Sequence, residues 1–164
     1  MRNKMTLSRT NLRVCLVVAI ILLPFAVEAQ STATQSTAAD DSKVRPPITK
    51  ADLQIVKRAR EILDSPSKWN RADNRECPAG AKTFSLYCAL QMATIEVSGK
   101  TDHRGAALQE ARFVIDEISA DGNYQHRLMN YNNDATTTFA DIQEVFRITE
   151  SLIALRLKAN ASKE

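Results

Sequence analysis

The chain is poor in the residues from which most catalytic and metal sites are built. Among its 164 residues are only two histidines, three cysteines and four glycines. It has no G-x-S-x-G nucleophile elbow, no H-E-x-x-H zinc motif and no glycine-rich loop to hold a phosphate. His103 and His126 stand among polar residues with no neighbouring nucleophile, which is typical of solvated surface positions. The sequence therefore predicts no cofactor and no metal, and it favours a protein that is not an enzyme.

Apolar runs long enough to span a membrane are also missing. The main run, residues 14–27, has 14 residues and contains Pro24, whereas a spanning helix needs about 20 apolar residues. Four basic residues precede or open the run, and Val27 and Ala29 are small residues three and one before a possible cleavage point. This pattern is typical of a secretory signal peptide over residues 1–29. We expect a periplasmic or extracellular protein with no stable membrane span after cleavage; an uncleaved membrane anchor is the alternative.

An excess of one charge is missing as well once the leader is set aside. The leader holds four of the 22 basic residues and one of the 19 acidic residues, so the mature chain carries 18 of each and is neutral. No run of lysine or arginine with interleaved aromatic residues appears. Nucleic acid is therefore excluded as a default partner, and an anionic membrane surface is excluded with it.

What remains divides into a spacer and one domain. Residues 30–47 are rich in Ser, Thr, Ala and Gln and hold almost nothing to bury, which predicts a disordered spacer. Residues 48–164 have the usual length of a single domain. Apolar residues recur there at helical spacing, and sustained two-residue alternation is absent. Helices are expected over residues 49–64, 83–97, 105–120 and 138–158.

The prediction is an all-α fold: a compact bundle of about four helices with two long loops, 65–82 and 123–137. Loops of this length are uncommon in a compact domain. Such a loop has a function, is held in place by other contacts, or contains a short helix or strand that the pattern does not reveal. Both are therefore places to look for a site.

Two cysteines stay in the chain when Cys15 leaves with the leader. Cys77 lies in the first long loop, and Cys88 lies in the second expected helix. An even count in an exported chain favours a disulfide, which would close a ring of 12 residues and stabilise the fold by about 3 kcal/mol. The alternative is a buried free Cys88 and an exposed Cys77. The spacing fits neither a redox pair nor a zinc site.

The second long loop has a polar stretch, residues 130–138, that partly resembles a calcium-binding loop. Ala135 stands where such a loop requires glycine, and Asp141 is shorter than the glutamate that usually completes it. Asp141 can also serve the start of the last helix together with Thr138. We therefore interpret the stretch as a turn and a helix cap.

Three short motifs carry a family resemblance. They are Trp69 after the first expected helix, Cys88-Ala89-Leu90 in the second, and Asn133-Asp134 before Thr138-Phe139. The chain resembles a family of small bacterial helical proteins known only as a domain of unknown function, and the resemblance implies no activity.

A buried tryptophan needs a partner for its indole N–H, so we expect both long loops to pack at one end of the bundle. Asp134 or a neighbouring backbone group would accept hydrogen bonds there. Trp69, Asn133, Asp134 and Thr138 are thus the candidate residues, either for a loop site or for a structural turn.

Three functional hypotheses follow. The first is a non-enzymatic module that binds an unknown protein or small-molecule partner. The second is an enzyme with a site on loops 65–82 and 123–137. The third is a purely structural protein of the cell envelope.

Overall fold

The computed structural model describes residues 45–119 and 124–162, all of which belong to the second of two units, residues 38–164. The predicted signal peptide and most of the predicted spacer lie outside the described residues. The helices are α1 (Lys50–Ile62), the short 3-10 helix η2 (Pro66–Lys68), α2 (Leu86–Ser98), α3 (Ala106–Ile118), α4 (Arg127–Asn133) and α5 (Phe139–Ala161). The described residues form no sheet, so the prediction of an all-α fold is confirmed.

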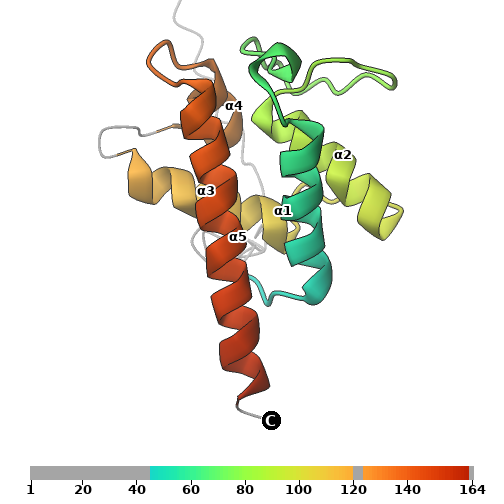
Figure 1. Cartoon of the computed structure of the whole chain (residues 1–164), viewed down its shortest axis with the longest axis vertical. Helices are drawn as coiled ribbons and strands as arrows, with labels where there is room; N and C mark the ends of the chain where they lie inside the picture. The colour runs from blue at the N-terminus through green and yellow to red at the C-terminus, as the bar shows by residue number, and fades with distance from the viewer. Residues whose placement is uncertain (1–44, 120–123, 163–164) are drawn as a thin grey trace, which may run out of the picture. The chain divides into compact units, whose positions relative to one another are not determined.

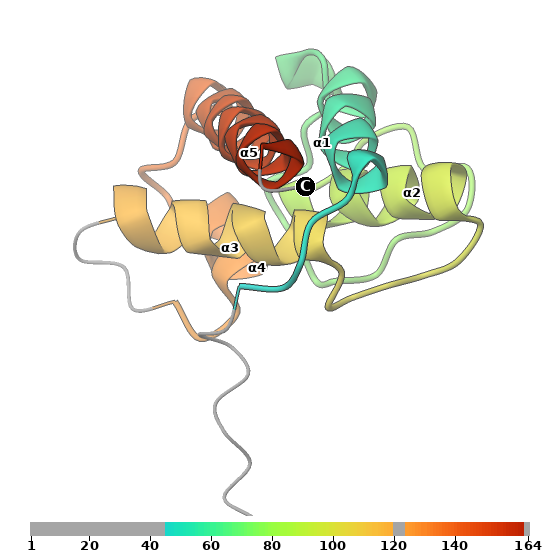
Figure 2. The ribbon, with the colours of Figure 1, turned by 90° about the horizontal axis from the view of Figure 1, so that it is seen from below.

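The helices form two layers. α1 and α5 lie side by side over α2 and α3, and α4 lies against α3 on the side away from α5 (Figures 1 and 2). α5 is the longest helix, and its C-terminal end extends past the other helices. The core lies between the layers and contains Phe146, Leu63, Leu86, Leu90, Leu108, Ile115, Ile142 and Ile153, all fully buried.

Local signals in the sequence explain where the helices begin and end. Thr49 and Thr138 each start a helix with an aspartate three residues later in a capping box. The Ser85 hydroxyl accepts a hydrogen bond from the Cys88 N–H (3.1 Å) at the start of α2, and Gly99 ends α2 with a φ of 74°.

α2 begins later than the apolar pattern predicted. The Phe84 N–H donates to the Lys68 carbonyl (2.7 Å), and the Phe84 carbonyl accepts from the Asn70 N–H (3.0 Å). These two bonds form a β-bridge between Trp69 and Phe84. The backbone at Phe84 is thereby extended, so the helix cannot start before Ser85.

The second long loop contains a helix that the sequence did not predict. α4 occupies Arg127–Asn133, inside the stretch assigned to the loop 123–137. Its buried apolar residues are only Leu128 and Tyr131, and three of its seven residues are asparagine, a weak helix former. A helix this short depends on tertiary packing, here against α2 and α3.

The predicted disulfide between Cys77 and Cys88 is present, with Cα atoms 5.3 Å apart. It ties the first long loop to the first turn of α2. Residues 45–47, the described end of the predicted spacer, also contact the domain: Arg45 pairs with Glu110 and Glu117, and the Pro46 carbonyl accepts from Arg156.

Candidate functional site

The two long loops meet at Asn132, in the last turn of α4. The Trp69 indole N–H donates to Asn132 Oδ1 (2.8 Å), and the Leu86 N–H donates to the same oxygen (3.0 Å). Asn132 Nδ2 donates to the Asn70 carbonyl (2.9 Å), and the side chain is fully buried. The acceptor for the indole is therefore Asn132, which the sequence did not single out. It is neither Asp134 nor a backbone group.

Asn133 holds the same loop three residues further along, at Asp73. Its Oδ1 accepts from the Asp73 N–H (2.7 Å), and its Nδ2 donates to the Asp73 carbonyl (2.8 Å). One side-chain amide thus pairs with both backbone groups of a buried loop residue. This is a structural bond, because both polar ends of Asn133 are used within the protein.

Asp134 shapes the turn that follows α4. Its carboxylate accepts from the Thr136 N–H and hydroxyl (2.8 and 2.7 Å) and from the Tyr124 hydroxyl (2.9 Å). These hydrogen bonds, those of Thr136 first, lower the pKa of Asp134. Thr138 does not contribute to this turn. It caps α5, because its hydroxyl and backbone N–H donate to Asp141 at the start of that helix.

Arg71 completes the junction. Its guanidinium lies 5.0 Å from the centre of the Trp69 ring and donates to the carbonyls of Asp134, Ala135 and Thr137. Sequence reasoning missed Arg71 and Asn132, because no local pattern distinguishes them from the neighbouring polar residues. Of the four candidates, Trp69, Asn133 and Asp134 come together here, and Thr138 caps the adjoining helix.

A second polar cluster joins α2, α3 and α4. The Tyr87 hydroxyl and His103 Nδ1 are 2.6 Å apart and their rings are stacked. Burial raises the pKa of Tyr87. Arg112 donates to the His103 carbonyl (3.0 Å), and Arg127 pairs with Asp116 (3.1 Å). His103 is exposed, as expected, but it has the Tyr87 partner that the sequence did not reveal.

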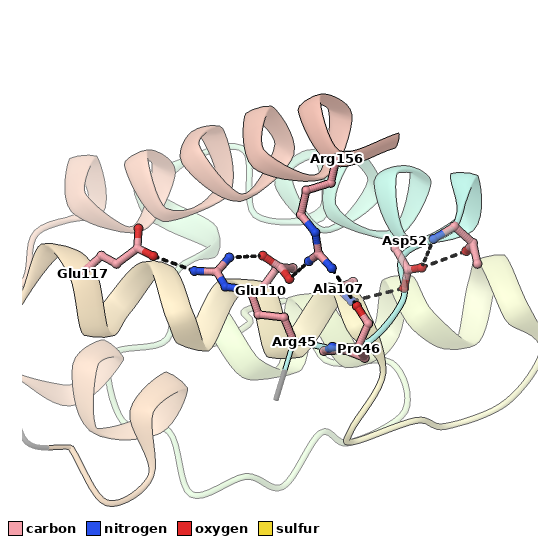
Figure 3. Close-up of polar contacts among 8 residues, drawn as sticks. Arg45, Pro46, Asp52, Ala107, Glu110, Glu117 and Arg156 are labelled. Atoms are coloured by element: carbon pink, nitrogen blue, oxygen red, sulfur yellow. Dashed lines mark hydrogen bonds and ion pairs between the residues drawn. The ribbon is translucent and has the colours of Figure 1, made fainter. Parts of the chain in front are cut away.

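A third cluster surrounds Glu110, which is fully buried in α3 (Figure 3). Its carboxylate lies between Arg45 and Arg156 and pairs with both. Arg45 also reaches Glu117 (2.6 Å), and its guanidinium lies 4.7 Å from the centre of the Phe113 ring. Every polar end of Glu110 is therefore used to join the start of the domain, α3 and α5.

A groove of about 490 Å³ lies between α1, α2 and the first long loop. Its half-buried apolar residues include Ile62, Phe84 and Met92. Arg58 and Glu96 pair across it (2.5 Å), linking α1 to α2. The full lining is Arg58, Glu61, Ile62, Lys68, Ala81, Lys82, Phe84, Met92 and Glu96.

Two features are absent from the part of the chain that the structure describes. No group of three or more His, Cys, Asp or Glu side chains is placed to hold a metal ion there. None of the helices in those residues is both long and apolar enough to cross a membrane.

The comparisons with known proteins point to one family. Neither the curated proteins nor the solved structures contain a match to this chain. The family described as "Family of unknown function (DUF6197)" matches residues 47–152, which include α1 to α4, the loop junction, Glu110 and most of α5. The match covers well over half of the chain, so this protein belongs to the DUF6197 family of unknown function.

Proposed function

We propose that this chain is an exported, non-enzymatic module that binds a partner protein or small molecule through the groove between α1 and α2. The observation that carries the proposal is the groove itself. Its volume, about 490 Å³, is in the range of natural ligand sites, and its mixture of apolar floor and charged rim is typical of them.

The walls of the groove are held in place by other contacts. Arg58 pairs with Glu96 on α2 and with Glu61 on α1 (2.5 and 3.0 Å), and Phe84 is fixed by the β-bridge to Trp69. Because these residues are already ordered, a partner would lose little free energy in arranging them. The floor residues Ile62, Phe84 and Met92 would contact an apolar part of that partner.

The loop junction supports an enzyme less well. An enzyme site there would need an apolar cavity with a strongly perturbed titrating group. The amides of Asn132 and Asn133 and the carboxylate of Asp134 are instead bonded within the protein. The signal-like leader and the disulfide together support export.

Binding in the groove is tested with a neutral apolar fluorophore, N-phenyl-naphthylamine. We expect its fluorescence to rise and saturate with the wild-type protein and to be lost with Met92→Lys. Leu155→Lys is the matched control, because Leu155 is 63% exposed and lies outside the groove. Equal binding by both variants would reject the groove, and no saturable binding would favour a purely structural protein.

Export is tested separately by expressing the full chain in a bacterial host and sequencing the N-terminus of the recovered protein. Cleavage after Ala29 is the expected result, so the mature protein would begin at Gln30. A periplasmic protein that still begins at Met1 would contradict the cleaved leader.

A further inference from the structure

Arg112 is a half-buried arginine that no described carboxylate neutralises. Its Nη1 donates to Gln109 Oε1 (2.7 Å), and its Nη2 donates to the His103 carbonyl (3.0 Å). Both acceptors are neutral. Removing a guanidinium from water without an opposite charge costs free energy, and burial accordingly lowers the pKa of Arg112, with a further contribution from the charge of Arg127.

Arg127 brings a second guanidinium to the same face of α3. Its Nε lies 3.1 Å from Asp116 Oδ1, and Asp116 follows Arg112 by one helical turn. Its Nη1 is buried and has no hydrogen-bond partner among the described residues. Asp116 is the carboxylate that pairs with Arg127 here, and its side chain is 41% exposed.

Tyr87, on α2, and His103 lie beside Arg112. The Tyr87 hydroxyl is 2.6 Å from His103 Nδ1, and the backbone carbonyl of His103 accepts from Arg112. The position of the imidazole is thus set by both neighbours. The hydrogen bond between Tyr87 and a neutral His103 uses one donor hydrogen and leaves one O–H or N–H of the pair to donate to an oxygen of an anion.

We propose that Arg112 and Arg127 bind the phosphate or carboxylate group of a small ligand, with the Tyr87–His103 pair at its edge. A guanidinium has five N–H donors in one plane, which suits two oxygens of one anion, and the bonds described here use only two of those of Arg112. Arg112 has only neutral acceptors here, and Arg127 pairs only with the exposed Asp116. The ligand would supply the negative charge that balances the two arginines. The site lies on α2, α3 and α4, so it is independent of the groove and of the function proposed for it.

The site has two arginines, which limits the ligand. The mature chain is neutral, so the arginines offer a local positive charge and no extended basic surface of the kind that nucleic acid requires. A compact anion with two or three oxygens at one end fits this arrangement.

The experiment is a calorimetric titration of the full domain with two probes, inorganic phosphate and succinate, at constant ionic strength set with chloride. We expect saturable binding of at least one probe, and the stronger probe identifies the group that the site prefers. Arg112→Gln and Arg127→Gln should each weaken that binding about tenfold, since each removes one charge-assisted contact.

Arg147→Gln is the matched control, because Arg147 is an exposed arginine on α5 that pairs with Glu144. Arg112→Lys keeps the positive charge and should therefore fold even if Arg112→Gln does not. It should still weaken binding several-fold, because lysine lacks the planar guanidinium that binds two oxygens at once. No saturable binding of either probe overturns the proposal. Wild-type affinity in all folded variants of Arg112 and Arg127 would also overturn the proposal.

Discussion

Asn132 is the residue on which the loop junction depends most. It is fully buried, and its amide makes bonds to Trp69, Leu86 and Asn70, which lie 46 to 63 residues away along the chain. A buried side chain whose donors and acceptor are all used stabilises a single arrangement, because any other arrangement leaves polar groups without partners.

Asn132→Ala should lower the free energy of unfolding by about 3 kcal/mol, since it leaves the indole, one backbone N–H and one carbonyl without partners. Asn130→Ala is the matched control on the same helix, because the Asn130 side chain makes no hydrogen bond described here. Urea denaturation measures both. Equal stability of the two variants would contradict the role assigned to Asn132.

Asp134 gives a prediction about pH. Its hydrogen bonds lower its pKa in the folded state, so the ionised carboxylate stabilises the fold above the pKa of the unfolded chain, about 3.9. That contribution is lost as the pH falls from about 5 through the lowered folded value. Asp134→Ala should therefore lower the melting temperature at neutral pH, and its stability should fall less steeply with acid than that of the wild type.

At the scale of helices, two aspartates with the same local motif have different tasks. Asp141 accepts only from Thr138, in its own helix. Asp52 accepts from Thr49 in the same way, and its other oxygen also accepts from the Ala107 N–H of α3 (3.1 Å). The N-cap residue before α3 is Gly105, which has no side chain to cap the helix, so Asp52 supplies the missing cap from α1.

Asp52→Ala should therefore cost more than Asp141→Ala. Loss of one capping interaction costs about 1 kcal/mol, which is the expectation for Asp141. Asp52→Ala removes two capping interactions, one at α1 and one at α3, so we expect the free energy of unfolding to fall by about 2 kcal/mol or more. Thermal or urea denaturation of the two variants side by side decides the matter, and a larger loss for Asp141→Ala would show that α3 does not depend on Asp52.

At the scale of the whole molecule, Glu110 joins three parts of the chain. It pairs with Arg45 at the start of the domain and with Arg156 near the end of α5 (Figure 3). Replacement of one member of a buried ion group leaves the others uncompensated. Glu110→Gln should therefore lower the free energy of unfolding by about 3 kcal/mol.

Glu117→Gln is the control for Glu110. Glu117 pairs with the same Arg45 but is 54% exposed, so its loss should cost about 1 kcal/mol or less. Chemical denaturation at low and high salt compares the two. A loss for Glu110→Gln as small as that for Glu117→Gln would mean that the cluster contributes little to the fold.

The disulfide is the other long-range constraint on the domain. The double substitution Cys77→Ser and Cys88→Ser should lower the free energy of unfolding by about 3 kcal/mol, because the unfolded chain gains freedom when the ring is opened. Thiol titration of the denatured wild-type protein should find neither cysteine free. Free thiols at both Cys77 and Cys88 would contradict the bridge.

Local sequence signals were enough for the parts of the fold that depend on near neighbours. The capping pairs at Thr49 and Thr138 marked the starts of α1 and α5. Apolar residues at helical spacing located α1, α2, α3 and α5 to within a few residues. The pairing of Cys77 with Cys88 also followed from the sequence, because only two cysteines remain outside the predicted leader.

Tertiary structure alone decided α4, the choice of Asn132 over Asp134 as the acceptor for Trp69, and the pairing of Arg127 with Asp116 on α3. α4 is too short and too rich in asparagine to signal itself, so it forms because Leu128 and Tyr131 are buried by other helices. The register of that helix then turns Asn132 inward and brings Arg127 to α3. Contacts between residues far apart in the chain leave no periodic pattern, which is why only the packed molecule shows them.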